Sequence, residues 1–462
     1  MTNLLQNVRT ESSPSDLKIT DMRFVDLYQA PMHCTLVRID TNQGISGFGE
    51  LRDFGSRTYA AMLKSRILGE NPCNINRIFS RIKQFGGPGR QGGGVSGIEI
   101  ALCDLAGKAY GVPVYQMLGG KFRDDARVYC DLGRHPRHPM TGEGMGAELK
   151  RHIEEDGFTM VKCILCIESV QMMYPDEPIL SGFPGFAEQL VQARQRHMLY
   201  VDANYSADPN GSIFERNRLY ETFSHQHPYT FTRITEHGLD RYEEELSKIR
   251  DAIGYQVPLA VDHLGHINLE DMARLLRRLE KYNLAWAEDP LPCTFVKEYK
   301  QLSCMTATPM ATGEDLYLKE GYYPLCKERA VPIIHPDICS CGGIFEMHRI
   351  GNMAQEHHIS MICHMCETPV AAMATAHVGV ATENFIAMEF NAPDDPWWND
   401  ILVGGPKPVI KNGFIIPENK PGLGFDGLND EVLEEHRLPH SPPLWAPTDD
   451  WNHEYSNDRT WS

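Results

Sequence analysis

Between Val261 and Glu389 the sequence repeats one pattern, in which a short apolar run ends in an acidic residue or a histidine. Successive members of the series are 23 to 27 residues apart: Asp262, Glu288, Glu314, Asp337, His364 and Glu389. That spacing suits one strand and one helix, and strands that alternate with helices pair in parallel. The pattern therefore predicts most of a (β/α)8 barrel, in which the carboxyl ends of the strands meet at one rim.

The rest of the chain is organised around this series. We expect residues 1–16 to be frayed and residues 17–125 to form an α+β domain, with antiparallel strands, a turn at 42–44 and then helices. The barrel is expected over 126–392, with strands near 126–130 and 158–166 before the strand of Asp262. Asp202 also ends an apolar run but lies outside the regular series, so 170–240 is interpreted as an insertion at the barrel mouth, a lid or an oligomer contact. The tail, 393–462, is expected to wrap back on the N-terminal domain.

Composition excludes several classes of protein. The net charge of −18 argues against a nucleic-acid partner or an anionic membrane surface. The absence of a charged-then-apolar leader and of a long apolar run predicts neither secretion nor membrane spanning. Thirteen cysteines, an odd number, favour reduced thiols in a cytoplasm. Two Cys-x-x-Cys strings begin at Cys163 and Cys363, but residues three apart on a strand face opposite ways, so buried thiols are favoured over a zinc site.

Three carboxylates on consecutive strand ends indicate a metal site. Asp262, Glu288 and Glu314 would approach one point, and three like charges that close need a cation. Ligands that are all oxygen favour a hard ion, Mg²⁺ first, with positions left for substrate. The alternative is that each acid is solvated or caps a helix.

His364 is the candidate base. An open Mg²⁺ site can bind a substrate carboxylate and stabilise the dianion formed when the α-proton is removed. Asp337, one unit upstream, would orient and polarise the imidazole; the alternative for His364 is a histidine satisfied in the core. Glu389 would hydrogen-bond the substrate carboxylate or the enediolate if protonated, and a structural salt bridge is its alternative.

The strings AWAEDPLP, MATGEDLY, HPDICSCGGIFEMHRIG and SMICH, with GGVSGIEIALCDLAGKAYGVPVYQMLGG upstream, resemble the mandelate-racemase-like subgroup of the enolase superfamily. The resemblance covers about residues 17–425. It implies an α/β fold, a modified TIM barrel of the form (β/α)7β, with an N-terminal α+β capping domain. It also implies Mg²⁺ on Asp262, Glu288 and Glu314, the His364–Asp337 pair as base, and a homo-oligomer, often an octamer. By analogy, loops carrying Arg57 and residues 86–94 would cover the mouth and set substrate choice.

One departure from the family bears on the reaction. Many racemases of the subgroup carry Lys-x-Lys at the end of the second strand, whereas this chain has Lys162, Cys163 and Ile164. Racemisation moves a proton between the two faces of the substrate and needs a base on each face. Without the second lysine, such a mechanism is less favoured. Lys162 could still meet the substrate carboxylate, with an ordinary structural lysine as the alternative.

Dehydration of an acid sugar to a 2-keto-3-deoxy acid through an enediolate needs only one base to remove the α-proton. It is therefore the predicted reaction. The leaving hydroxide needs an acid: His364 for a syn elimination, or a second group for an anti one. His266 is a hypothesis for that group, against a packing role, and His263 is a weaker one. The alternatives to a dehydratase are an epimerase or cycloisomerase that uses the same enediolate, and a catalytically silent ligand-binding relative.

Overall fold

The computed structural model describes residues 13–28, 30–132, 141–181, 233–262, 264 and 267–454. The chain divides into two compact units, and each is described by itself. The first unit comprises residues 1–129, 313–329 and 333–462, and the second comprises 130–312 and 330–332. Most of the predicted insertion, with Asp202, lies outside the described residues, as do His263 and His266.

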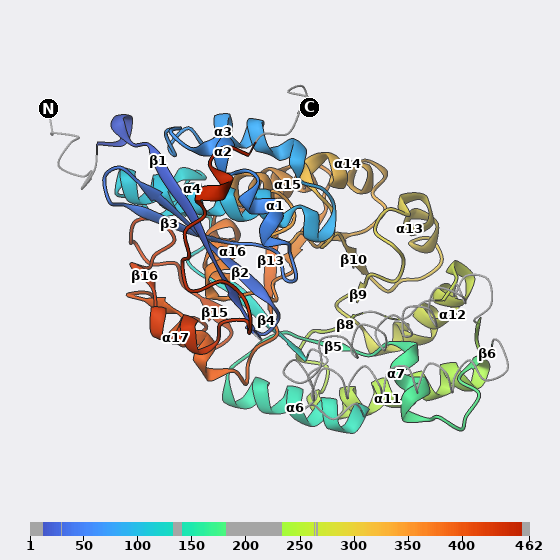
Figure 1. The fold of residues 1–462 in the computed structure, drawn as a ribbon. Coiled ribbons are helices and arrows are strands. Elements are labelled where there is room, and N and C mark those ends of the chain that lie inside the picture. The colour runs from blue at the N-terminus through green and yellow to red at the C-terminus, as the bar shows by residue number, and fades with distance from the viewer. Residues whose placement is uncertain are drawn as a thin grey trace, which may run out of the picture. The chain divides into compact units, whose positions relative to one another are not determined.

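The fold class is the predicted modified TIM barrel with an N-terminal α+β domain (Figure 1). Helices separate its parallel strands along the chain. The strands follow one another in the order of a (β/α)7β barrel: β4 (Ala126–Leu132), β5 (Val161–Ile164), β8 (Leu259–Asp262), β9 (Ala287–Glu288), β10 (Met310–Thr312), β11 (Ile333–Ile334), β12 (Ser360–Cys363) and β13 (Phe385–Phe390). The strand of Asp262 is therefore the third, as predicted.

The N-terminal domain belongs to the first unit. It opens with an antiparallel meander of β1 (Ile19–Leu27), β2 (Cys34–Thr41) and β3 (Ser46–Glu50), with Gly44 at φ 77° in the predicted turn. Five α-helices follow: α1 (Arg57–Ala61), α2 (Lys64–Ile67), α3 (Ile75–Ile82), α4 (Gly93–Tyr110) and α5 (Val114–Met117). Strand β3 packs closely on α4, since a Cβ at Gly49 would lie 2.0 Å from the carbonyl oxygen of Gly97.

The glycine-rich segment at 86–94 has the composition of a flexible linker but forms packed structure. Residues Gly89–Gln91 form a 3-10 turn, and the last glycines begin helix α4. The glycines serve close approach rather than flexibility, because a Cβ at Gly92 would lie 2.2 Å from the carbonyl oxygen of Ser340.

The barrel helices of the first unit are α14 (Leu318–Glu328), α15 (Ile344–Glu356) and α16 (Pro369–Ala381). Two buried acids of the N-terminal domain accept hydrogen bonds at the starts of two of these helices. Glu50 accepts from the backbone N–H groups of Thr368 and Ala371 and from the Thr368 hydroxyl. Glu99 accepts from the N–H groups of Ile344 and Phe345.

The second unit carries α6 (Gly142–Glu155), α7 (Ile167–Met173), α11 (Glu236–Ile253), α12 (Leu269–Leu279) and α13 (Val296–Leu302). Asn268 caps α12, accepting a hydrogen bond from the backbone N–H of Asp271. Strand β5 is shorter than the predicted 158–166, because Cys166 is already the N-cap of α7. Short strands β6 (Leu180–Ser181) and β7 (Arg233–Ile234) pair in antiparallel fashion at the described edges of the predicted insertion.

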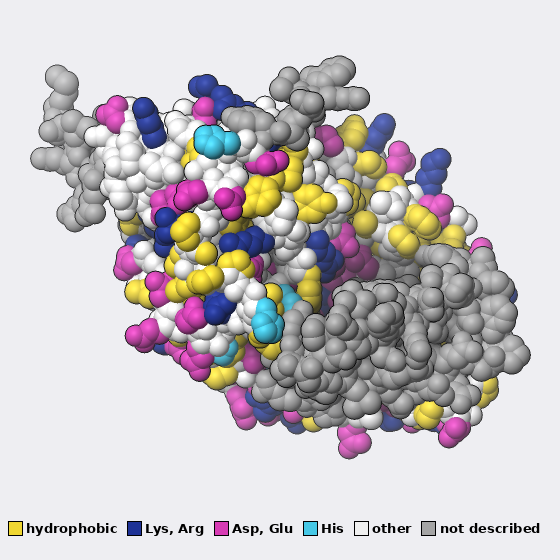
Figure 2. All heavy atoms as spheres, viewed as in Figure 1, with side chains coloured by type: hydrophobic (Ala, Val, Ile, Leu, Met, Phe, Trp, Pro, Cys, Tyr) yellow, Lys and Arg dark blue, Asp and Glu magenta, His cyan; other side chains and the backbone are white. Residues whose placement is uncertain are grey.

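The C-terminal segment contains β14 (Leu402–Val403), β15 (Phe414–Ile415), β16 (Gly427–Leu428) and α17 (Asp430–Glu435). It contacts the N-terminal domain within the first unit: Leu438 N–H donates to the Asp26 carbonyl, and the Trp445 ring lies under Arg38. All thirteen cysteines are free thiols. No helix among the described residues is long and apolar enough to cross a membrane. On the face shown in Figure 2, described acidic, basic and apolar side chains are interspersed.

Candidate active site

His364 and Asp337 form a buried hydrogen-bonded pair in the first unit. His364 directly follows β12, Asp337 follows β11 by three residues, and the two positions form a parallel β-bridge. Nδ1 of His364 lies 2.8 Å from Oδ2 of Asp337. The parallel pairing of β11 with β12 places the two residues side by side. The structure therefore brings the predicted pair together; its role as a base stays a prediction.

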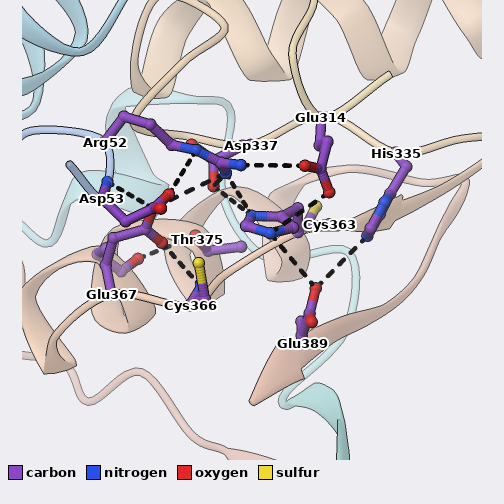
Figure 3. Close-up of polar contacts among 12 residues, drawn as sticks. Arg52, Asp53, Glu314, His335, Asp337, Cys363, Cys366, Glu367, Thr375 and Glu389 are labelled. Carbon is purple, nitrogen blue, oxygen red and sulfur yellow. Dashed lines mark hydrogen bonds and ion pairs between the residues drawn. The ribbon is translucent and has the colours of Figure 1, made fainter. Parts of the chain in front are cut away.

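Arg52 is the central cation of this site, and sequence reasoning missed it. It follows β3 by two residues and is buried. Nη1 of Arg52 lies 2.7 Å from Oδ2 of Asp337 and 2.5 Å from Nδ1 of His364. Figure 3 shows Arg52 lying among Asp53, Asp337 and Glu314.

Further charged groups surround Arg52. Its Nε lies 2.7 Å from Oδ1 of Asp53, and Arg90 donates to the other oxygen of Asp53 at 3.0 Å. Arg90 also bonds Asp315, the neighbour of Glu314, at 3.3 Å. Glu367 is buried 3.8 Å from Nη1 of Arg52, and burial raises the pKa of Glu367 well above its usual value.

Neighbouring charges set the ionisation of the pair. Burial alone would raise the pKa of Asp337, but Arg52 and His364 outweigh it and lower the pKa to about 2. Burial lowers the pKa of His364, but nearby carboxylates, Glu314 foremost among them, raise it well above its usual value. Nε2 of His364 lies 3.4 Å from Oε2 of Glu314. A cation that shared the Glu314 carboxylate would weaken this effect and favour the neutral, basic imidazole.

Glu389 lies within β13 on the other side of His364. Its Oε2 lies 4.0 Å from Nε2 of His364 and accepts a hydrogen bond of 3.2 Å from the Tyr129 hydroxyl. That hydroxyl also lies 3.1 Å from Nε2 of His335, and Figure 3 shows Glu389 between His335 and the centre of the site. Sequence reasoning missed His335 although it stands in the same string as Asp337, two positions earlier.

Asp262 and Glu288 share a cation in the second unit. Both are buried at the ends of paired parallel strands, β8 and β9. Nζ of Lys162, at the register position beside Ala260, lies 3.0 Å from Asp262 and 2.7 Å from Glu288. The Trp286 indole N–H donates to the second oxygen of Glu288 at 2.7 Å. Lys162 therefore binds two acids at once, where the sequence left open a substrate contact or an ordinary structural lysine.

The chemistry of the three predicted metal ligands, Asp262, Glu288 and Glu314, suits a hard cation such as Mg²⁺. Two buried carboxylates at adjacent strand ends hold an ammonium between them, so the pair already binds positive charge. Glu314, which follows β10 by two residues, belongs to the first unit and binds Arg52 at 3.2 Å. All three offer the carboxylate oxygens that Mg²⁺ prefers.

A (β/α)7β barrel, an N-terminal α+β domain and acids at successive strand ends define one class of enzyme. The family model for the enolase C-terminal domain matches residues 144–431. The model for the mandelate racemase / muconate lactonizing enzyme N-terminal domain matches residues 17–119. The chain belongs to this mandelate racemase/muconate lactonizing enzyme group of the enolase superfamily.

Named relatives cover nearly the whole chain. The D-xylonate dehydratase of Haloferax volcanii is 29% identical over 429 residues, which are 92% of this chain and 90% of the relative. The D-galactonate dehydratase of Pectobacterium atrosepticum is 25% identical, over 94% of this chain and 98% of the relative. The crystal structure of a mandelate racemase/muconate lactonizing enzyme-like protein from Rubrobacter xylanophilus matches with a TM-score of 0.73 and 27% identity, over 92% of this chain and 98% of that one.

Proposed function

We propose that this chain is a Mg²⁺-dependent hydro-lyase that converts a polyhydroxy carboxylate to a 2-keto-3-deoxy acid. The observation that carries the proposal is the buried His364–Asp337 pair beside Glu314 and Glu389. The names of the relatives, which are dehydratases of D-xylonate and D-galactonate, support an acid sugar as the substrate class. We further propose a homo-oligomer, as the family resemblance implies.

Asp262, Glu288 and Glu314 are the residues that would hold the metal. Support comes from their positions at or just after three consecutive strands, β8, β9 and β10. Bound there, Mg²⁺ would supply a Lewis acid for the substrate carboxylate. The ammonium of Lys162, which lies on two of these acids, adds positive charge beside them.

His364 would remove the α-proton through Nε2. Its other ring nitrogen faces Asp337, whose low pKa keeps that carboxylate ionised at neutral pH. An ionised Asp337 stabilises the imidazolium that forms when His364 takes the proton, and it holds the ring in place. The proton then stands on His364, on the side of the ring that faces Glu314 and Glu389.

Loss of the β-hydroxyl as water gives an enol, whose tautomerisation yields the 2-keto-3-deoxy acid. In a syn elimination, His364 returns its proton to the leaving oxygen, so that one group serves both steps. Glu389 would hydrogen-bond the enediolate if protonated, and the Tyr129 hydroxyl that donates to its Oε2 helps to fix its orientation. An anti elimination would need a second acid, for which His266 stays a hypothesis outside the described residues.

The missing second lysine favours dehydration over racemisation. Position 164 is isoleucine, so the end of β5 offers Lys162 alone, and that lysine is bound to Asp262 and Glu288. A racemase or epimerase that uses the same enediolate is the alternative, and it would need a base on the opposite face of the substrate.

A substrate screen tests the proposal. The protein is incubated with Mg²⁺ and a panel of aldonates and aldarates, beginning with D-xylonate and D-galactonate, and 2-keto acid formation is measured. We expect turnover of at least one acid sugar, its loss in the His364→Asn variant, and its loss when EDTA removes the metal. Failure to convert any member of the panel in the presence of Mg²⁺ would contradict the assignment.

A further inference from the structure

The N-terminal domain places one residue, Arg52, directly against the His364–Asp337 pair. Leu51 N–H donates to the Thr35 carbonyl and so ties this stretch to β2. On the other side Gly93 closes on Arg52, because a Cβ at Gly93 would lie 2.8 Å from the Arg52 backbone nitrogen. These contacts hold the backbone at Arg52 in place, and its side chain is fully buried.

Each of the three guanidinium nitrogens lies within ion-pair distance of a different carboxylate. Nε lies 2.7 Å from Asp53, Nη1 lies 2.7 Å from Asp337, and Nη2 lies 3.2 Å from Glu314. A buried arginine is costly unless its charge is matched and its donors are used. Here the matching acids include the partner of the candidate base and a proposed metal ligand.

We propose that Arg52 is a positioning residue for the base, holding the carboxylates of Asp337 and Glu314 in a fixed relation to the His364 ring. The role of this positioning in catalysis rests on the proposed function. Arg52 thereby makes the N-terminal domain part of the proton-transfer machinery.

The geometry requires arginine rather than any cation. A planar guanidinium presents donors in a rigid fork, whereas a lysine ammonium is a single point on a flexible stem. Lysine at position 52 could neutralise one of the acids but could not place three separate nitrogens within ion-pair distance of Asp53, Asp337 and Glu314. Arg90 donates a hydrogen bond to Asp53 and so helps to fix the position of the carboxylate beside the Arg52 guanidinium.

Three variants separate positioning from charge and from stability. Arg52→Met removes the fork, Arg52→Lys keeps only the charge, and Lys64→Met is the matched control. Lys64 is a buried cation of the same domain that bonds Asp21 and Thr448. We expect Arg52→Met and Arg52→Lys both to lower kcat by roughly 10–100-fold with little change in KM. Lys64→Met lowers thermal stability and leaves kcat per folded molecule unchanged.

Chemical rescue tests the requirement for the fork. In Arg52→Ala, added guanidinium should restore part of kcat, and methylammonium at the same concentration should not. Equal rescue by the two cations, or recovery of wild-type kcat in Arg52→Lys, would show that charge alone suffices and overturn the proposal. Retention of kcat within twofold in Arg52→Met would overturn it as well.

A spectroscopic measurement does not depend on turnover. With ¹⁵N-labelled histidine, the His364 side-chain resonances are assigned by their disappearance in His364→Asn. They should shift in Arg52→Met and stay in place in Lys64→Met; unchanged resonances in Arg52→Met would remove the contact on which the proposal depends. If the wild type fails to dehydrate any acid sugar, the proposed function fails, and this spectrum still decides whether Arg52 sets the environment of His364.

Discussion

Replacement of Glu50 by glutamine should change how the stability of the protein depends on pH. Glu50 is fully buried, where it accepts hydrogen bonds at the start of α16. Burial raises its pKa from 4.5 to about 7, although hydrogen bonds from Thr368 and Ala371 oppose the rise. A carboxyl whose pKa is higher in the folded state holds its proton more tightly there than in the unfolded chain. Its contribution to stability is therefore complete below about pH 4.5 and is lost as the pH rises through 7.

The size of the effect follows from the two pKa values. Each pH unit between them is worth about 1.4 kcal/mol, so the wild type should lose about 2.5 kcal/mol more than Glu50→Gln between pH 5 and pH 8. All other titrating groups are shared by the two proteins and cancel in the comparison. The variant also carries a constant cost, because a glutamine offers only one acceptor oxygen in place of two.

Urea unfolding at pH 5 and pH 8 measures this difference. The matched control is Glu320→Gln, which removes an acid whose side chain is 65% exposed. The control should follow the wild type at both pH values, whereas the stability of Glu50→Gln relative to the wild type should improve at pH 8. Parallel behaviour of Glu50→Gln and the wild type would refute the view that Glu50 is neutral when buried.

Three further predictions follow from other parts of the structure. Gly49→Ala should destabilise the protein by about 1–3 kcal/mol in thermal or urea unfolding, because its Cβ would lie 2.0 Å from the Gly97 carbonyl; Gly427→Ala, with open space around it, should have little effect. Lys162→Met should lower the Tm without metal and enlarge the rise in Tm on adding Mg²⁺, because it leaves Asp262 and Glu288 without their ammonium; an unchanged response to Mg²⁺ would count against the metal assignment. Asp337→Asn should lower kcat by roughly 10²-fold or more without loss of the folded state, and wild-type kcat in this variant would exclude the pair as the base.

The sequence predicted the barrel units well because each is a local pattern. Helix α12 begins after the capping residue Asn268, and α16 begins at Pro369 after the capping residue Thr368. The ends of the parallel strands are equally local, which is why Asp337 and His364 could be paired before their distance was known. Strand β5 was overextended because Leu165 and Cys166 are as apolar as a strand although they lead into α7.

The rest depended on contacts between distant parts of the chain. Arg52 meets His364 from 312 positions away, and nothing in the string GELRDF distinguishes it from a surface arginine after a strand. From the sequence alone, Glu50 and Glu99 would be expected on the surface. Both are buried, because each accepts hydrogen bonds at the start of a helix. The glycine-rich segment at 86–94 has the composition of a linker, and only the close approach at Gly92 reveals its packing role.

We propose that one imidazole, that of His364, takes the α-proton of an acid sugar before water is lost. Turnover in D₂O with Mg²⁺, followed by NMR of substrate and product, tests it most directly. We expect a 2-keto-3-deoxy acid from the wild type and neither product nor α-proton exchange from His364→Asn. Exchange of the α-proton without water loss in the wild type, or undiminished product formation by His364→Asn, would contradict it.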